Sequence, residues 1–175
     1  MAVFAIVVLF GTAYAAFPEV RIRTLNLLIE FSDKAASLTL GGANNSSQRN
    51  DRASSVLNED GRLRGYCLPE IPDDFELEYE SNTSASALIR YINGNKTIGF
   101  SVMSAQGSVL NVDTENAEEV KNISVRGYSG LLVKKGIGID ITWADTDNNN
   151  FVMVSCDGLD EETVWEYAEV MQYVK

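Results

Sequence analysis

Histidine is absent from the chain, and cysteine and proline are scarce, with two and three residues among 175. Without histidine there is no Ser–His–Asp triad, no Cys–His nucleophile pair and no His-ligated zinc site. Two cysteines are weak evidence for a disulfide framework, so we expect Cys67 and Cys156 to be unpaired, although an oxidising exterior would allow them to pair. These absences favour a protein that is not an enzyme and that carries no cofactor and no metal.

Positive charge is also in short supply. The chain has 14 Lys and Arg against 25 Asp and Glu, which gives a net charge of −11. Nucleic-acid affinity depends mainly on Lys and Arg contacts to phosphates, so this charge opposes it. We therefore expect no nucleic-acid partner.

Charged side chains are missing altogether from residues 1–18, which are almost wholly apolar. A membrane span needs about 20 apolar residues, so this run predicts a transmembrane anchor of near-minimal length. Ala13-Tyr14-Ala15 also fits a signal-peptide cleavage site, but no Lys or Arg precedes the apolar run. The expected protein is a single-pass protein of the cell membrane with its C-terminal domain on the extracytoplasmic side. A cleaved signal peptide or a buried core helix is the alternative.

Two segments connect this run to the rest of the chain. Residues 19–40 carry apolar side chains at helix-like spacing, which predicts a juxtamembrane amphipathic helix. Residues 41–60 are mostly small and polar, without periodicity, and predict a flexible linker. The folded body is expected over residues 61–175.

Alternating apolar and polar residues predict antiparallel strands in the body. The clearest case puts Ile137, Ile139, Ile141 and Trp143 on an inner face, with Gly138, Asp140 and Thr142 facing outward. Asn93-Gly94 predicts a two-residue hairpin turn of type I′.

The last segment predicts a helix. Asp160 is a suitable N-cap, Glu161 and Glu162 suit the first turn, and an apolar stripe follows to Val174. The expected fold class is α+β: a mostly antiparallel β-sheet meander with a packed C-terminal helix, preceded by the N-terminal apolar and amphipathic helix.

Several stretches together resemble a known family. They are Tyr66-Cys-Leu-Pro-Glu-Ile-Pro-Asp-Asp-Phe75, Val125-Arg-Gly-Tyr-Ser-Gly130, Ile139-Asp-Ile-Thr-Trp143 and Phe151-Val-Met-Val-Ser-Cys-Asp-Gly-Leu-Asp160. In this order they resemble the bacterial domain-of-unknown-function family 4367 over residues 66–174. The resemblance implies the outer portion of a single-span membrane protein, in some members similar to anti-sigma factors with a cytoplasmic segment before the span. It carries over no catalytic residues.

The sequence thus predicts a non-catalytic, membrane-tethered extracytoplasmic binding or sensing module of a bacterial envelope regulator, either whole or truncated. Its expected partners are the membrane, through the N-terminal helix, and an unknown extracytoplasmic ligand or protein. The alternative is a secreted hydrolase or inhibitor released from a cleaved signal peptide. Tyr66 and Tyr128 lie at expected loop positions and are the candidate contact residues.

Acidic residues offer weaker hypotheses. Asp145, Asp147 and Asn149 begin like a calcium-binding loop, but the glycine of position 6 and the bidentate Glu of position 12 are missing. A solvated hairpin turn is the simpler interpretation. Catalysis by paired carboxylates would need two of them across a cleft, which sequence does not reveal.

Overall fold

The computed structural model describes residues 27–31, 35–40, 56–105 and 109–175. These residues form ten strands and a helix, α3 (Glu161–Val170). The strands are β1 (Leu27–Phe31), β2 (Ala35–Leu40), β3 (Glu76–Asn82), β4 (Ser86–Asn93), β5 (Lys96–Ser104), β6 (Val109–Asp113), β7 (Glu119–Val125), β8 (Tyr128–Lys135), β9 (Gly138–Asp145) and β10 (Asn150–Asp157). The α+β class, with an antiparallel sheet and a C-terminal helix, is confirmed.

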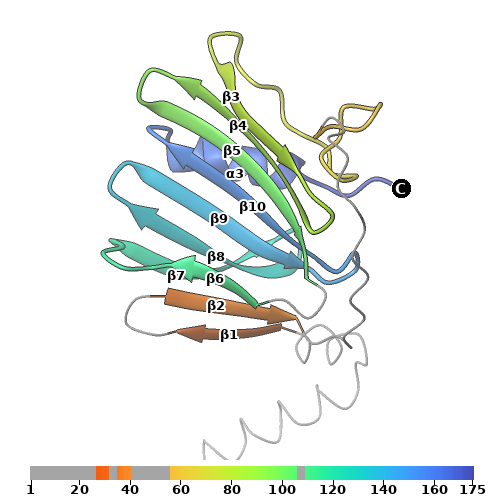
Figure 1. The fold of residues 1–175 in the computed structure, drawn as a ribbon. Coiled ribbons are helices and arrows are strands. Elements are labelled where there is room, and N and C mark those ends of the chain that lie inside the picture. The colour runs from red at the N-terminus through yellow and green to blue at the C-terminus, as the bar shows by residue number, and fades with distance from the viewer. Residues whose placement is uncertain (1–26, 32–34, 41–55, 106–108) are drawn as a thin grey trace, which may run out of the picture.

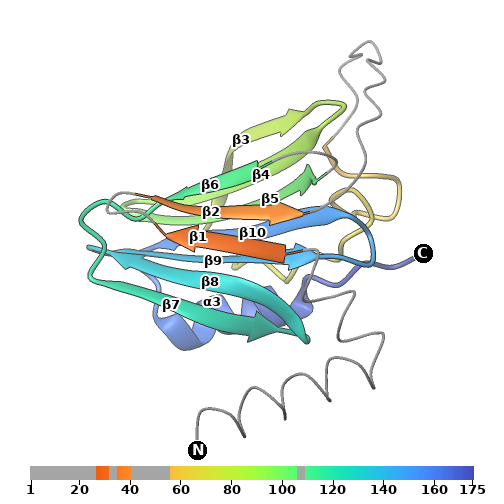
Figure 2. The same ribbon diagram turned by 90° about the horizontal axis from the view of Figure 1, so that it is seen from below.

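Seven strands form one antiparallel sheet in the order β3-β4-β5-β10-β9-β8-β7. The sheet consists of two meanders, β3 to β5 and β7 to β10, which meet where β10 pairs with β5 (Figure 1). A separate three-stranded sheet has the order β1-β2-β6. Figure 2 shows this smaller sheet on one side of the large sheet and α3 on the other.

The main core lies between the large sheet and α3. Alternate residues of the central strands point into it, and Trp143, Phe100 and Ile141 are each at most 1% exposed. The side chain of Asp160 accepts a hydrogen bond from the Thr163 amide at 2.9 Å, which confirms the predicted N-cap. Val164 and Ala168 are the buried residues of the helix.

A second core covers the opposite face near β6. Val112 packs there against Leu131, Val133 and Phe151 of the large sheet. This second layer explains an error in the predicted alternation, because Thr142, expected to face solvent, is 1% exposed. Ile137, expected inside, lies in the turn before β9 and is 60% exposed.

The amphipathic helix predicted over 19–40 is wrong for residues 27–31 and 35–40, which form β1 and β2. Leu27, Ile29 and Phe31 alternate at a period of two, and a short apolar run of this kind fits either a strand or a helix. The partner that decides is β6, far along the chain, which pairs with β2 in the register Leu38↔Leu110. The predicted anchor over 1–18 lies outside the described residues. Within the described ranges, no helix has the length and apolarity needed to cross a membrane.

Two further boundaries differ from prediction. Val56 is 3% exposed and belongs to the main core, so the folded body begins before the expected residue 61. The β4–β5 turn consists of Gly94 and Asn95, because Asn93 pairs with Lys96. Of the two turn residues, Gly94 alone has positive φ, at 60°, as a type II′ turn requires.

Candidate functional site

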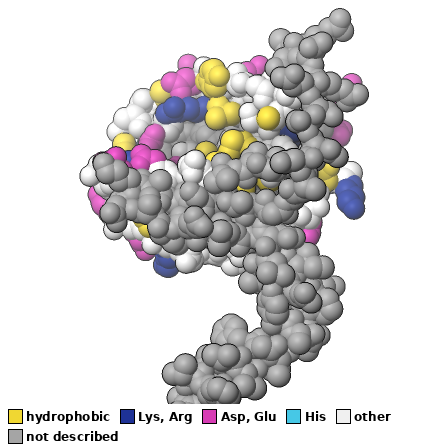
Figure 3. Space-filling view, turned by 60° about the horizontal axis from the view of Figure 1, so that its bottom comes forward, with side chains coloured by type: hydrophobic (Ala, Val, Ile, Leu, Met, Phe, Trp, Pro, Cys, Tyr) yellow, Lys and Arg dark blue, Asp and Glu magenta, His cyan; other side chains and the backbone are white. Residues whose placement is uncertain are grey.

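A hollow of about 180 Å³ opens on the face of the large sheet opposite α3. We call it the sheet-face hollow. Its lining residues come from β4, β5 and β10 and are Leu88, Arg90, Thr97, Gly99, Phe100, Ser101, Met153, Ser155 and Asp157. Figure 3 shows hydrophobic side chains next to basic and acidic ones on the part of this side that the grey atoms leave in view.

Strand register arranges these residues in rows across the sheet, because directly paired residues share a face. The first row is Leu88, Ser101 and Met153. The second row is Arg90, Gly99 and Ser155, continued on β9 by Asp140. The third row contains Thr97 and Asp157. An apolar end and an acidic end therefore share one hollow.

Arg90 and Asp157 form the charged wall. The Arg90 Nε lies 3.1 Å from Glu78 Oε2, and its Nη2 lies 3.8 Å from Asp157 Oδ2. Thr97 donates its hydroxyl proton to the same Asp157 oxygen at 2.7 Å. These contacts hold the Asp157 carboxylate in place at the edge of the hollow.

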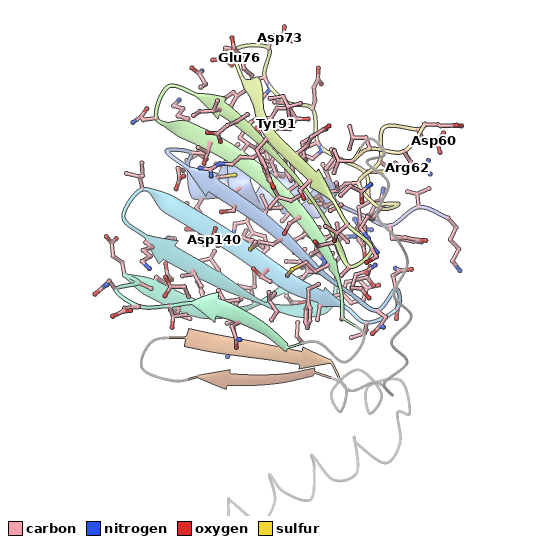
Figure 4. The ribbon with its side chains drawn as sticks, viewed as in Figure 1. Asp60, Arg62, Asp73, Glu76, Tyr91 and Asp140 are labelled. Carbon is pink, nitrogen blue, oxygen red and sulfur yellow. The ribbon has the colours of Figure 1, made fainter. Side chains whose placement is uncertain are left out.

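Asp140 stands beside the hollow on β9, where Figure 4 labels it. The Ser155 hydroxyl, which lines the hollow, donates to Asp140 Oδ1. Burial raises the pKa of the Asp140 carboxyl above its ordinary value of 3.8, and the charge of Asp157 raises it further. The Ser155 hydrogen bond and the charge of Lys135 oppose this rise in pKa. The two carboxyl groups are therefore close enough to influence each other electrostatically.

Ser101 lines the hollow and is only 6% exposed. Its hydroxyl has no hydrogen-bond partner among the described residues. A buried hydroxyl left without a partner costs about 1–3 kcal/mol, so native structures rarely retain one without a reason. Ser101 is thus a candidate for contact with a ligand.

The chemistry of the hollow suits a small polar ligand with an apolar part. Its volume is below the roughly 300–1,000 Å³ typical of pockets for drug-sized ligands. Leu88 and Met153 supply apolar surface, while Arg90, Asp157 and three hydroxyl side chains supply polar groups. In the part of the chain that the structure describes, no group of three or more His, Cys, Asp or Glu side chains is placed to hold a metal ion.

Tyr66 was predicted to lie in a loop as a contact residue, but the structure places it in the interior. The side chain is 1% exposed, and its hydroxyl donates to Asp145 Oδ2 at 2.6 Å. The amide of Asn150 donates in turn to the Tyr66 hydroxyl at 3.3 Å. Tyr66 is buried because its backbone bridges to Leu63 and Tyr173, which brings it under the C-terminal segment. The sequence offered no sign of this pairing.

Tyr128 is the first residue of β8 rather than a loop residue, and it is half-buried. Its hydroxyl donates to Asp147 Oδ2 at 2.8 Å. It lines a second, polar pocket of about 140 Å³ together with Arg126, Asp145, Asn148 and neighbouring residues. The structure thus brings both predicted tyrosines to the β9–β10 turn, but only Tyr128 reaches a pocket. Its role in contacting a partner stays a prediction.

Asp145, the first residue of the calcium-like stretch, is 3% exposed and serves the turn. It accepts hydrogen bonds from the Asp147 amide at 3.2 Å and the Asn148 amide at 3.1 Å. The Asn148 side-chain amide adds a third at 2.8 Å, besides the bond from Tyr66. A carboxylate occupied in this way caps its own hairpin turn, which agrees with the interpretation of this stretch as a turn.

The cysteines are both free, as predicted. Cys156 is buried in the main core, and burial raises its pKa to about 12. A thiol with so high a pKa is a poor nucleophile at neutral pH, because the thiolate is the reactive form. Cys67 is partly exposed.

Sequence reasoning missed the residues of the sheet-face hollow, although part of the signal was present. Asp140 was expected to face outward on the strand that the structure shows as β9. The β9–β10 register then places Ser155 opposite Asp140. The pairing of β10 with β5, which adds Gly99 and Ser101 to the floor, joins distant segments and left no local pattern.

The chain was compared with known proteins to identify its family. No curated protein and no solved structure matches it. The sequence profile of the family described as Domain of unknown function (DUF4367) matches residues 65–171, which is more than half of the chain. This agrees closely with the resemblance noted over residues 66–174. The chain belongs to the family of this domain of unknown function, DUF4367.

Proposed function

We propose that the chain is a non-catalytic, membrane-tethered extracytoplasmic binding or sensing module of a bacterial envelope regulator, and that its ligand binds in the sheet-face hollow. The observation that carries the binding role is Ser101, whose buried hydroxyl lacks a described partner in a hollow lined with polar groups. Buried polar groups are normally satisfied, so a ligand that supplies the missing hydrogen bond is a direct explanation.

The tether and the location rest on sequence. Residues 1–18 are apolar and uncharged, which suits a membrane anchor. The resemblance to the DUF4367 family also implies the outer part of a single-span protein. The net charge of −11 supports a partner other than nucleic acid. Under this proposal the anchor holds the domain at the outer surface of the cell membrane.

A labelling experiment tests location and tether together. We would replace Cys67 by Ser and Ile137 by Cys, because Ile137 is 60% exposed in the β8–β9 turn and Cys156 is buried. A membrane-impermeant maleimide is then added to intact bacteria expressing the full chain and, as the matched control, to lysed cells. The Cys67→Ser chain without the new cysteine measures background labelling.

The proposal predicts equal labelling of intact and lysed cells, with the protein in the membrane fraction at an intact mass that includes residues 1–15. Labelling only after lysis would contradict an extracytoplasmic domain. A labelled, soluble product in the medium that begins near Ala16 would contradict the tether and support secretion.

One observation favours the second candidate, a secreted hydrolase. Asp140 has a raised pKa and lies near the ionisable Asp157, and such a pair is what general acid–base hydrolysis uses. The small volume of the hollow and the engagement of Asp157 by Arg90 and Thr97 weigh against it. Secretion into the medium, together with glycoside hydrolysis that Asp140→Asn abolishes, would establish this candidate instead.

A further inference from the structure

We propose that the sheet-face hollow binds an aliphatic primary ammonium group, carried either by a lysine-like side chain or by a small free amine. This inference deepens the proposed function and rests on it, since it names the class of ligand for the same hollow. Three observations carry it: the balance of charge, the order of the rows across the sheet, and the unpartnered hydroxyl of Ser101.

The balance of charge around the hollow is negative. Glu78, Asp140 and Asp157 contribute carboxylates, and Arg90 contributes one guanidinium that lies beside two of them. Lys135 is also near enough to affect Asp140, but it is paired with Asp113 at 2.7 Å. An anionic ligand would meet the surplus carboxylates, whereas a cation would compensate them. The ligand is therefore expected to carry positive charge.

The rows place apolar and acidic groups at a distance that an alkylamine can span. Successive rows on one face lie about 7 Å apart, because two strand residues rise that far. An alkyl chain resting on Leu88 and Met153 would put its terminal nitrogen over the second row. Gly99 leaves the floor of that row free of a side chain, and Asp140 and Ser155 lie at its end.

Asp157 is the diagonal neighbour of Asp140 across the β9–β10 pair, a relation that separates residues by about 7–8 Å. An ammonium between them has three N–H donors, which suits two carboxylates and a hydroxyl. Ser101, in the first row, offers an acceptor to a polar group further along the ligand, such as a backbone amide. An alkylammonium therefore matches both ends of the hollow.

Methionine methyl NMR on the full chain provides the test. Met153 lines the hollow, whereas Met171 is fully buried in the main core on the other face and serves as an internal reference. The peptide-like probe is Nα-acetyl-lysine methylamide, and the free-amine probe is 1,5-diaminopentane. The matched control is Nα-acetyl-norleucine methylamide, which keeps the alkyl chain and lacks the ammonium.

The expected result is a saturable shift of the Met153 methyl signal with an ammonium probe, none with the norleucine control, and no shift of Met171. Tighter binding of the lysine derivative would assign the ligand to a side chain, and tighter binding of the diamine would assign it to a small molecule. Both results support the ammonium class.

Variants locate the binding. Asp140→Asn and Asp157→Asn should each weaken binding about tenfold, as the loss of a charged hydrogen-bond partner predicts. Ser101→Ala should weaken the lysine derivative by about fivefold. Asp73→Asn removes an equal charge from an exposed residue far from Asp140 in Figure 4, and should leave the affinity unchanged. An unchanged Met171 signal in each variant confirms that the core remains folded.

Three results would overturn the inference. Equal shifts with the norleucine control would show a merely apolar site. Binding of Nα-acetyl-glutamate methylamide instead of the amines would show that the charge was assigned wrongly, while the binding role would stand. Absence of any Met153 shift with all probes would exclude the ammonium class. The maleimide experiment measures location separately, so its outcome does not depend on these results.

Discussion

Replacing Tyr66 by Phe tests the account of the buried Tyr66–Asp145 pair. Phenylalanine keeps the ring, whose centroid lies 5.4 Å from that of Tyr173 in an edge-on contact. It removes the hydroxyl that donates to Asp145 Oδ2 at 2.6 Å. Hydrogen bonds to charged groups contribute about 1.5–3 kcal/mol, more than neutral ones.

The size of the stability loss depends on the hydrogen-bond donors that Asp145 keeps. Asp145 is 3% exposed, so water does not easily replace the lost donor. It keeps the two backbone amides and the Asn148 side chain as donors, so the carboxylate is not left bare. We therefore expect a loss of about 2 kcal/mol in the free energy of unfolding, or about 4–8 °C in Tm for a chain of this length.

The assay is urea unfolding of the full chain, followed by tryptophan fluorescence. The midpoint should fall with an unchanged m-value, which indicates altered stability rather than an altered unfolded state. Tyr79→Phe is the matched control, because Tyr79 is 55% exposed, and it should change stability by less than about 0.5 kcal/mol. If Tyr66→Phe changes stability no more than this control does, the reasoning about the buried pair is wrong.

Three further predictions follow from packing, charge and thiol reactivity. Gly130→Ala should destabilise the protein by about 2 kcal/mol in the same urea assay, because an added Cβ would clash with the backbone carbonyl oxygen of Thr142 on β9. A loss below about 1 kcal/mol would show that the backbone adjusts. Burial raises the folded-state pKa of Asp140, so its stabilising contribution is complete below its unfolded pKa and is lost as the pH rises through the raised value. Asp140→Asn should therefore gain stability relative to the parent chain as the pH rises above about 4, and parallel pH–stability curves would contradict this. A thiol reagent should modify Cys67 in the native protein and Cys156 only after unfolding, because burial raises the pKa of Cys156 to about 12. Rapid modification of two thiols per native chain would refute this prediction.

Local patterns predicted the elements better than their partners. The capping residue Asp160 and the inward positions of Ile139, Ile141 and Trp143 depend on neighbouring residues, and the structure confirms them. The pairing of β2 with β6 and of Tyr66 with Tyr173 joins distant segments, so neither left a local signal. These two long-range pairings account for the wrong helix prediction at residues 27–31 and 35–40 and for the misplaced Tyr66.

In the candidate site, too, local sequence patterns could place some residues, whereas long-range packing determines the others. Its polar residues on β9 and β10 belong to one hairpin, and register alone would have placed Asp140 opposite Ser155. The hollow itself needs β4 and β5 beside β10, and it needs the second layer to cover one end of the sheet and leave the other open. Coverage of this kind depends on tertiary packing, which a single sequence does not display.

The central place of β10 also has a consequence for how the chain acquires its structure. Until residues 150–157 are synthesised, β5 and β9 have no strand between them, and each half-sheet presents an unpaired edge. Such edges are templates for incorrect pairing with other chains. The two meanders can form early from local contacts, but they are joined only through β10, so the sheet closes only after residues 150–157 have been synthesised. A chain halted before β10 would expose both edges, and it would be a natural substrate for chaperones and proteases.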